Sequence, residues 1–255
     1  MTGGIEIRIA ATEERHGLDA MLHDMEEPED YVPEVIGDWL AQESVFIAFI
    51  NGVVAGMSHF EYMPDGGVWL SGLRVAKSLR KSGVGSALTR FAVNMPGRTV
   101  FRLAISSINS ASISISEKAG FRRRCVVSLW RAPGVSAGLA ELRPAECGVD
   151  EMEYTDLFDG LLPTTYLAFD PGTADREKMR SEGLSFVSDR RGSIFLLNNG
   201  AEALTPVHLE DRASFSSIPP GYILVAGEQE KLDAIGLEQS LWTKSLGIYE
   251  YRRND

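Results

Sequence analysis

The segment from Arg80 to Leu88, which reads Arg-Lys-Ser-Gly-Val-Gly-Ser-Ala-Leu, constrains the fold more than any other part of the chain. It follows a strand-like run and opens a helical pattern, so it predicts a strand, a glycine-containing turn and a helix in that order. Gly83 and Gly85 lack Cβ atoms, and successive backbone N–H groups can therefore point at one anion. The helix adds its unpaired first-turn N–H groups and the positive end of its dipole. The segment predicts a phosphate-binding turn.

Two common phosphate-binding loops do not match this segment. A Walker A loop needs four residues between its first glycine and a Gly-Lys-Ser/Thr sequence, and no such sequence occurs here. A dinucleotide fingerprint needs a small residue three positions after Gly85, where this chain has Leu88. No parallel series of strands and helices surrounds the turn either. The segment therefore indicates neither a P-loop nucleotidase nor a Rossmann-type oxidoreductase.

A second pattern follows about 25 residues downstream, from Asn109 to Phe121. Asn109 is a typical helix N-cap, and Gly120 is a typical residue at which a helix ends. A strand-like run over 100–105 separates this predicted helix from the phosphate-binding turn. Gly120-Phe121 then begins another strand-like run. The two patterns therefore belong to one continuous arrangement of strands and helices.

Taken together, the two patterns resemble those of the GNAT N-acetyltransferase superfamily. Its acyl-coenzyme A loop reads Arg/Gln-x-x-Gly-x-Gly/Ala, which Arg80, Gly83 and Gly85 match. Its second signature has an Asn, a small residue, an apolar residue, a Tyr and a closing Gly-Phe; here the matching positions hold Asn109, Ser112, Ile115, Gly120 and Phe121. The resemblance covers residues 5–132. It implies an α/β (α+β) fold: a mixed, mostly antiparallel central sheet with helices on both faces.

The hydrophobic pattern along the first half predicts elements in the order that this fold requires. The Asn51-Gly52 pair is a strong signal for a hairpin turn between two of the strands. We expect strands at 5–10, 45–50, 53–63, 68–75, 100–105 and 121–130, and helices at 12–25, 33–41, 84–95 and from 109 onward.

The length of 255 residues suggests two domains. We expect a GNAT domain at 1–132, a linker rich in Pro, Gly and Ser at 133–140, and a C-terminal domain at 141–255. In that domain a strand at 222–226, a helix at 228–235, Gly236-Leu237 and a strand at 246–251 repeat the order of residues 100–131. The C-terminal domain is then either a degenerate second GNAT-like half or an unrelated α+β domain. No second Arg-x-x-Gly-x-Gly loop follows residue 132.

The resemblance implies acetyl-coenzyme A as co-substrate. The backbone of the strand that ends at Leu73 and Val75 would bind the pantetheine arm and polarise the thioester. The turn would hold the pyrophosphate, and the start of the second helix would touch the pantetheine end. The implied cofactor-binding residues are Leu73, Val75, Arg80, Lys81, Ser82, Gly83, Val84, Gly85, Ser86, Asn109 and Ser112.

The catalytic residues are less clear, because the chain departs from the family at two positions. Ser116 stands where many members have a tyrosine general acid, and a serine hydroxyl is far less acidic than a phenol. The strand at 68–72 carries no carboxylate that could act as base. His59 and Glu61 share one face of the preceding strand by two-residue alternation, and either could accept a proton through water or be an ordinary strand residue.

Three aromatic residues complete the candidates. Tyr62 lies on the opposite face of the strand from His59 and is a possible substitute for the missing acid. Trp69 and Tyr31 could line the acceptor pocket, although aromatic residues at strand spacing are more often part of a core.

The charge distribution suggests what the acceptor is. Residues 74–124 hold eleven Lys or Arg and one acid, whereas no Lys or Arg lies between Arg15 and Arg74, where eleven acids occur. A basic segment suits an anionic cofactor, and an acidic rim over the acceptor site would attract a cationic amine. The same acids could instead form a merely solvated face.

Composition narrows the remaining classes. The net charge of −11 gives no indication of nucleic-acid binding, and no apolar run is long enough for a membrane span. Cys125 and Cys147 form no metal-binding pattern, and we expect no metal, a cytoplasmic location and possible homodimers. The resulting hypothesis is an N-acetyltransferase that acts on a primary amine of a cationic small molecule or peptide. The alternative is a non-catalytic acyl-coenzyme A-binding or regulatory module.

Overall fold

A computed structural model gives the fold of the chain. It describes residues 4–25, 27, 30–131, 142–145, 158–164, 167–188, 192–200, 202–208, 222–227, 238–239 and 245–253. The predicted linker at 133–140, the predicted helix at 228–235 and Cys147 lie outside these residues. Statements about the C-terminal half below concern its described parts.

The N-terminal half contains the strands and helices that the sequence predicts, in the predicted order. Its strands are β1 (Ile5–Ile9), β2 (Val45–Ile50), β3 (Val53–Tyr62), β4 (Val68–Val75), β5 (Val100–Ser106) and β6 (Arg122–Arg131). Its helices are α1 (Arg15–Asp24), α2 (Val32–Ala41), α3 (Val84–Val93) and α4 (Ser110–Lys118), with short 3-10 turns at Thr12–Glu14 and Lys77–Leu79. Asn51 and Gly52 both have positive φ, 52° and 76°, which confirms the predicted hairpin turn.

The C-terminal half is built mainly of short strands. These are β7 (Arg143–Pro144), β8 (Leu162–Pro163), β9 (Ala168–Phe169), β10 (Leu184–Ser188), β11 (Ile194–Asn198), β12 (Ala203–His208), β13 (Ile223–Gly227), β14 (Glu238–Gln239) and β15 (Leu246–Arg252). One helix is described there, α5 (Arg176–Ser181), and the Asp175 carboxylate accepts hydrogen bonds from its first N–H groups.

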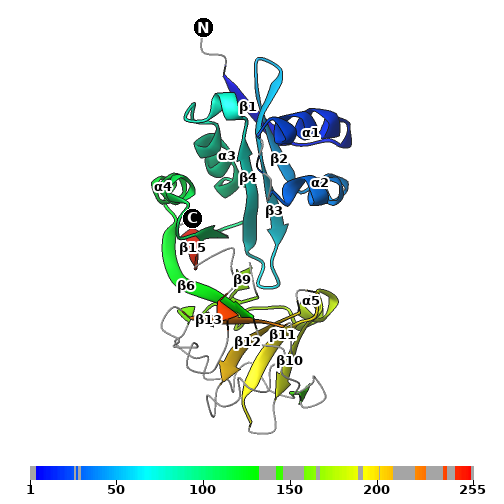
Figure 1. Ribbon diagram of the computed structural model, residues 1–255, viewed down its shortest axis with the longest axis vertical. Coiled ribbons are helices and arrows are strands. Elements are labelled where there is room, and N and C mark those ends of the chain that lie inside the picture. The colour runs from blue at the N-terminus through cyan, green and yellow to red at the C-terminus, as the bar shows by residue number, and fades with distance from the viewer. Residues whose placement is uncertain are drawn as a thin grey trace.

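One large sheet runs through both halves, in the order β1-β2-β3-β4-β5-β15-β6-β13-β12-β11-β10-β7, with β14 paired to β6. The pairs β4–β5 and β12–β13 are parallel, and the other described pairs are antiparallel. In Figure 1 the helices α1 and α2 cover one side of the N-terminal part of the sheet, and α3 and α4 lie on the other. This confirms the expected fold class, a mostly antiparallel mixed sheet with helices on both faces.

The last strand, β15, joins the sheet of the N-terminal half. The sequence predicts Leu246–Arg252 as a strand of the C-terminal domain, and in the structure this strand lies between β5 and β6 and pairs with both. Against β5 its register runs from Leu246 opposite Ser106 to Arg252 opposite Val100. The long strand β6 in turn continues into the C-terminal half, where it pairs with β13 (Figure 1). Each half therefore contains a strand from the other. Sequence patterns report local periodicity and cannot reveal such a long-range exchange.

The apolar cores reflect the same exchange. One core lies between the sheet and α1 and α2, and a second lies under α3 on the opposite face. A third joins the two halves: it packs Met63 and Trp69 of the N-terminal half against Phe158, Phe169 and Val225 of the C-terminal half. The two halves thus share a buried interface as well as strands.

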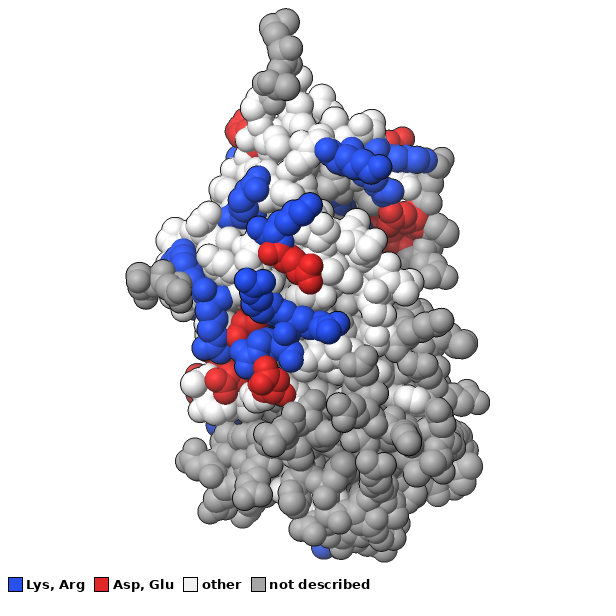
Figure 2. Space-filling model, turned by 90° about the vertical axis from the view of Figure 1, so that its left-hand side faces the viewer, with Lys and Arg blue, Asp and Glu red and all other residues white. Residues whose placement is uncertain are grey.

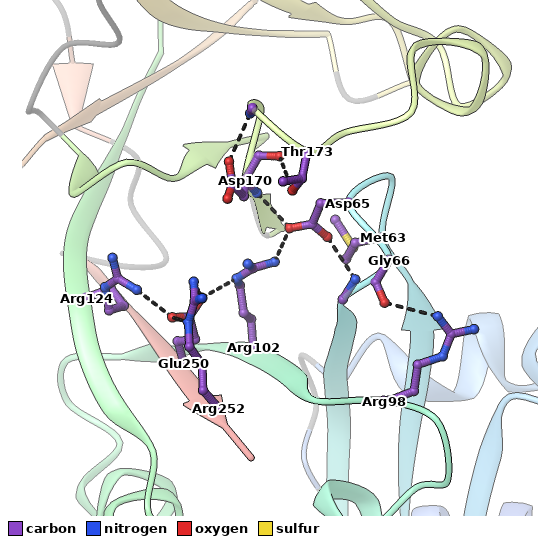
Figure 3. A network of polar contacts seen from close by, with 12 residues as sticks. Met63, Asp65, Gly66, Arg98, Arg102, Arg124, Asp170, Thr173, Glu250 and Arg252 are labelled. Atoms are coloured by element: carbon purple, nitrogen blue, oxygen red, sulfur yellow. Dashed lines mark hydrogen bonds and ion pairs between the residues drawn. The ribbon is translucent and has the colours of Figure 1, made fainter. Parts of the chain in front are cut away.

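A buried network of charges holds β15 in register (Figure 3). Arg102 on β5 donates to the Glu250 carboxylate on β15 at 2.8 Å and to the Asp65 carboxylate in the β3–β4 turn at 2.6 Å. Arg124 on β6 also contacts Glu250, and the Asp170 N–H donates to Asp65 at 2.7 Å. Burial alone would raise the pKa of Glu250, but hydrogen bonds from Arg252 and Arg102 hold it below its usual value. The network connects three N-terminal segments with the last strand.

The strand order of the two halves is similar. The sequence β1-β2-β3-β4, then a parallel partner β5, has a counterpart in β7-β10-β11-β12, then a parallel partner β13. The degenerate second GNAT-like half stays a prediction, because helix 228–235 on which the proposed repeat partly rests lies outside the described residues.

Candidate functional site

The predicted phosphate-binding turn lies between the end of β4 and the start of α3. Gly83 is the N-cap of α3 and has φ +91°, a conformation that side chains other than glycine rarely adopt. A Cβ atom at this position would meet nothing within 4 Å, so the backbone here faces open space. Lys81 also has a positive φ, +68°. The turn therefore has the exposed backbone that an anion would need.

The two glycines of the turn have different surroundings. A Cβ at Gly85 would lie 3.2 Å from the Ile115 side chain of α4 and within 4 Å of Val75 and Leu73 on β4. Gly85 thus allows α3 to pack closely against β4 and α4. This contact also brings the second sequence pattern next to the first.

The strands β4 and β5 separate just where the predicted pantetheine site lies. Their parallel pairing covers Val68 opposite Phe101 and Trp69 opposite Arg102. Beyond Trp69, β4 pairs with β3 alone as far as Val75, so one edge of its backbone has no strand beside it. The side chains of Leu73 and Val75 pack against the core under α3. The polar groups that these two residues can offer to a ligand are those of the backbone, as the resemblance implies.

A bulge interrupts β4 at this free edge. The register between β3 and β4 shifts between the pairs Met57–Arg74 and His59–Ser71, and Gly72 has φ +60°. A Cβ at Gly72 would lie 2.8 Å from the ring of Trp39 on α2, so no larger residue fits. The glycine inside a strand pattern was the sequence signal for this bulge, which the sequence interpretation did not use.

The second predicted helix, α4, is capped as expected. The Asn109 side chain accepts a hydrogen bond from the Ser112 N–H at 3.1 Å. Gly120 has φ +98° and ends the helix against the ring of Tyr251 on β15. Ser116, at the position of the usual tyrosine, is 4% exposed, and its carbonyl accepts the Phe121 N–H. The Ser116 side chain is therefore short and buried.

His59 and Glu61 share one face of β3, as predicted, but their surroundings differ. His59 is 3% exposed, its ring stacks on Trp39 at 3.9 Å, and its Nδ1 lies 2.9 Å from the Ser71 Oγ. Burial lowers the pKa of His59 to about 4, so the ring is neutral near pH 7. Glu61 is partly exposed, and burial together with the negative charge of Glu182 raises its pKa.

The acidic stretch is partly paired with the basic segment. Asp30 accepts two hydrogen bonds from Arg74, at 2.7 and 2.9 Å, and Glu27 accepts one from Arg80 at 2.6 Å. Burial would raise the pKa of Asp30, but hydrogen bonds from Arg74 and the Val32 N–H keep it lowered. Sequence reasoning placed these acids at the acceptor rim and missed both ion pairs. They join the α1–α2 connection to β4 and to the phosphate-binding turn.

The aromatic candidates lie in three different places. Tyr31 packs edge-on against Trp39, with the Arg74 guanidinium over its ring. Trp69 is buried in the core between the two halves. Tyr62 points away from these residues, toward the Met95 sulfur and under the Arg98 guanidinium. Of the three, Tyr31 is therefore the one next to the stacked Trp39–His59 pair.

Basic side chains gather over the face that carries α4 and the edge of β6 (Figure 2). Lys118, the last residue of α4, and Arg122 and Arg123, the first two of β6, are exposed. Among the described residues no group of His, Cys, Asp or Glu could hold a metal ion. Burial raises the pKa of the Cys125 thiol to about 12, so this cysteine is not a ready nucleophile. None of the described helices has the length and apolar character that crossing a bilayer requires.

Comparison with known proteins gives a match to one family model over part of the chain and a similarity of fold over most of it. The family model "Acetyltransferase (GNAT) family" matches residues 13–121. Searching the curated proteins finds no match. Among solved structures, a candidate acetyltransferase from Thermoplasma acidophilum is 22% identical, with a TM-score of 0.58 over 92% of this chain and 89% of that one.

Two further structures cover almost the whole chain. A candidate acetyltransferase from Pyrococcus horikoshii is 14% identical, with a TM-score of 0.58 over 98% of this chain and 90% of its own. A GCN5-related N-acetyltransferase from Sphaerobacter thermophilus is 13% identical, with a TM-score of 0.57 over 98% and 97%. At these identities the likeness concerns the fold, and it extends through the C-terminal half.

Proposed function

Residues 13–121 of this chain belong to the acetyltransferase (GNAT) family, and from that premise we propose that the protein moves an acetyl group from acetyl-coenzyme A to a primary amine, by direct transfer in a ternary complex. The observation that carries the proposal is the pairing of an open phosphate-binding turn at Gly83 with the free edge of β4. The turn offers a place for the pyrophosphate, and the free edge offers a place for the pantetheine arm. Both lie on consecutive segments of the chain.

Several residues would hold the co-substrate. Backbone groups from Lys81 to Ser86 would bind the pyrophosphate at the start of α3, where the helix dipole favours negative charge. Arg80 and Glu27 are both about half exposed, so their ion pair contributes less than about 1 kcal/mol and Arg80 can turn to a phosphate. Asn109 and Ser112 would touch the pantetheine end. Acetyl-coenzyme A would supply the activated acetyl group as a thioester.

The contribution of the protein to the reaction would be mainly positioning. The buried Ser116 stands where many family members have a tyrosine acid. We therefore propose that water returns the proton to the departing thiolate. Correct orientation of two reactants alone can supply up to about 7–11 kcal/mol of the barrier. A transferase of this family can therefore work without a dedicated tyrosine acid.

We propose a cationic acceptor, a small molecule or an exposed peptide amine. Asp24, Glu34 and Asp38 are exposed near the α1–α2 connection and are not among the residues paired with Arg74 or Arg80. Glu61 of β3 and Glu182, just after α5, repel each other, and burial raises the pKa of both. A cationic group between the halves would relieve that repulsion, although Lys178 already provides part of this effect.

An acceptor panel tests this proposal: the release of coenzyme A thiol from acetyl-coenzyme A is measured with polyamines, aminoglycosides, amino acids and peptides as candidate amines. Gly83→Val should abolish the thermal stabilisation that coenzyme A gives. Gly97→Val is the matched control, because Gly97 also has a positive φ, +70°, and no neighbour within 4 Å, but lies beyond α3. Equal stabilisation of both variants would show that the turn does not bind the cofactor. Stabilisation without thiol release for any amine would instead support the non-catalytic alternative, which the buried Ser116 favours.

A further inference from the structure

Two polar side chains meet beneath α2, at the free edge of β4. His59 and Ser71 stand directly opposite each other in the β3–β4 ladder, and the His59 Nδ1 and Ser71 Oγ are 2.9 Å apart. Ser71 is two residues past Trp69, the last residue of β4 that pairs with β5. It also directly precedes the Gly72 bulge. The pair therefore lies where the end of a pantetheine arm running along β4 from the turn would arrive.

The two members of the pair differ in accessibility. His59 is enclosed: it is 3% exposed, its ring stacks on Trp39 with planes 10° apart, and its other cross-strand neighbour is Val45. Ser71 is partly exposed. A ligand could thus touch the serine hydroxyl and not the imidazole. His59 can act on a ligand only through Ser71, as a positioning residue.

The state of the imidazole decides what Ser71 can offer. A neutral ring carries one N–H, and the hydrogen bond can run in either direction. If the proton is on Nε2, Nδ1 accepts the serine O–H, and the lone pairs of Oγ are left to accept a further hydrogen bond. If the proton is on Nδ1, the serine hydroxyl is left free to donate. An attacking amine needs its own lone pair for the carbonyl carbon, so it can only donate an N–H.

We propose that Ser71 is the acceptor-binding residue at the reacting centre: its Oγ accepts an N–H of the incoming amine, while the neutral His59 holds the serine hydroxyl through Nδ1. This inference rests on the proposed function. In the transfer, the amine nitrogen bonds to the acetyl carbon and the carbon–sulfur bond breaks with its electron pair on sulfur. The nitrogen loses one proton to water, and sulfur takes one proton from water. Ser71 and His59 keep their protons throughout.

Other titratable groups near His59 are on three elements. Glu61 follows on the same strand, Tyr31 lies beyond Trp39, and the Asp30–Arg74 pair bridges the α1–α2 connection and β4. Burial, not any of these charges, is the cause of the lowered pKa of His59. Glu61 is the rival acceptor of the amine proton, because it is partly exposed on the same face of the strand.

Nitrogen-15 NMR of histidine-labelled protein tests the proposal without any acetyl transfer. We expect His59, assigned by its loss in His59→Asn, to show protonated Nε2 and unprotonated Nδ1, with no titration between pH 8 and 5. Propylamine, added to protein saturated with coenzyme A, should shift the Nδ1 signal in the wild type and not in Ser71→Ala. A protonated Nδ1, or a wild-type signal that propylamine leaves unchanged, would overturn the proposal.

Turnover of the amine that proves to be a substrate in the acceptor panel shows whether His59 positions Ser71 or accepts a proton. Asn places an acceptor oxygen near the position of Nδ1 but cannot take a proton. We therefore expect Ser71→Ala and His59→Leu to lose about tenfold in kcat/KM, the effect of one hydrogen bond, and His59→Asn to stay within about threefold of the wild type. A fall in His59→Asn equal to that in His59→Leu would show that His59 accepts the proton, against the proposal.

Ser58→Ala is the matched control for these variants. Its hydroxyl is buried next to His59 and has no hydrogen-bond partner within the described part of the chain, so its loss should leave both signals and turnover unchanged. If no amine is turned over, the proposed function fails, while the NMR result still decides whether His59 and Ser71 form the acceptor site for an amine.

Discussion

Each half of the sheet contains one short parallel pair of strands, β4–β5 or β12–β13, whose pairing stops after two residue pairs. We call the place where the two strands separate an opening, and the two openings differ in what lies beside them. The pairing of β4 with β5 ends at Trp69 and Arg102, and that of β12 with β13 ends at Leu204 and Leu224. The first opening ends in a charged side chain that belongs to a buried network, and the second ends in two apolar ones. The same arrangement of strands thus supports two different interiors.

A hydroxyl group lies just past the last paired residue at each opening, and the two hydroxyls differ in whether a ligand can reach them. Ser71 of β4 is partly exposed and hydrogen-bonded to His59. Thr205 of β12 is buried, and its Oγ1 donates to the Pro163 carbonyl of the β8–β9 hairpin at 2.6 Å. One hydroxyl remains accessible to a ligand, and the other is closed off by the chain itself. The fold alone therefore does not create a site; the covering segments decide which opening remains available.

The largest expected effect tests whether the halves are independent. A chain that ends at Ser245 lacks β15, so β5 and β6 each lose a partner and the fully buried Ile248 leaves the shared core. We expect it to lose cooperative unfolding, measured by circular dichroism in urea. A chain that ends at Arg253 keeps the strand and is the control. Wild-type stability in the shorter chain would mean that the N-terminal half folds without the strand it receives.

The next effect concerns the charged end of the first opening. Arg102→Leu makes it resemble the second, but leaves Asp65 and Glu250 buried without their shared arginine. Removing one partner of such a buried pair costs about 3–5 kcal/mol of unfolding free energy. Arg252→Leu removes a mostly exposed partner of the same Glu250 and should cost less than about 1 kcal/mol. Urea unfolding of both variants measures the difference, and equal losses would contradict a role for burial.

Much of the first opening could be predicted from sequence, because its signals are local. The turn at Gly83, the Asn109 cap and the Asn51-Gly52 hairpin each depend on residues close together in the chain. The insertion of β15 depends on residues about 150 positions apart, and no periodicity reports it. The site around His59 could be predicted in part. Alternation places His59 and Glu61 on one face of the strand, but the stacking of His59 on Trp39 depends on how α2 packs on β3, which alternation does not report.

The acidic rim illustrates a further limit. Charge counts correctly separated an acidic from a basic segment, yet could not show that Asp30 and Glu27 pair with Arg74 and Arg80. Pairing depends on which side chains meet in space, and it removes two charges from the surface that an acceptor would encounter. Asp24, Glu34 and Asp38 are exposed in the described part of this stretch, and the cationic-acceptor proposal depends in part on them.

The buried His59 gives the first opening a sensitivity to acid. Its pKa is about 4 in the folded chain and about 6.5 when unfolded, so between these values the unfolded state binds the proton and the folded state does not. Stability therefore falls as pH drops below about 6.5. By pH 5 the loss from this group is about 2 kcal/mol. The fall in unfolding free energy from pH 7 to pH 5 should be smaller by that amount in His59→Asn; an equal fall in both proteins would mean that the imidazole is solvated.

The smallest expected effect separates the two hydroxyls by what each supports. Thr205→Val removes one buried hydrogen bond and leaves the Pro163 carbonyl without it, which should cost about 1–2 kcal/mol of unfolding free energy. Stabilisation by coenzyme A should be unchanged in that variant, because the second opening has no Arg-x-x-Gly-x-Gly turn after it. Ser71→Ala should instead reduce turnover; it also leaves the buried His59 Nδ1 without its hydroxyl partner, which should cost a similar amount of unfolding free energy, about 1–2 kcal/mol. If Thr205→Val also weakened the response to coenzyme A, the two openings would be coupled through the shared core, and the division between an accessible and a closed opening would no longer hold.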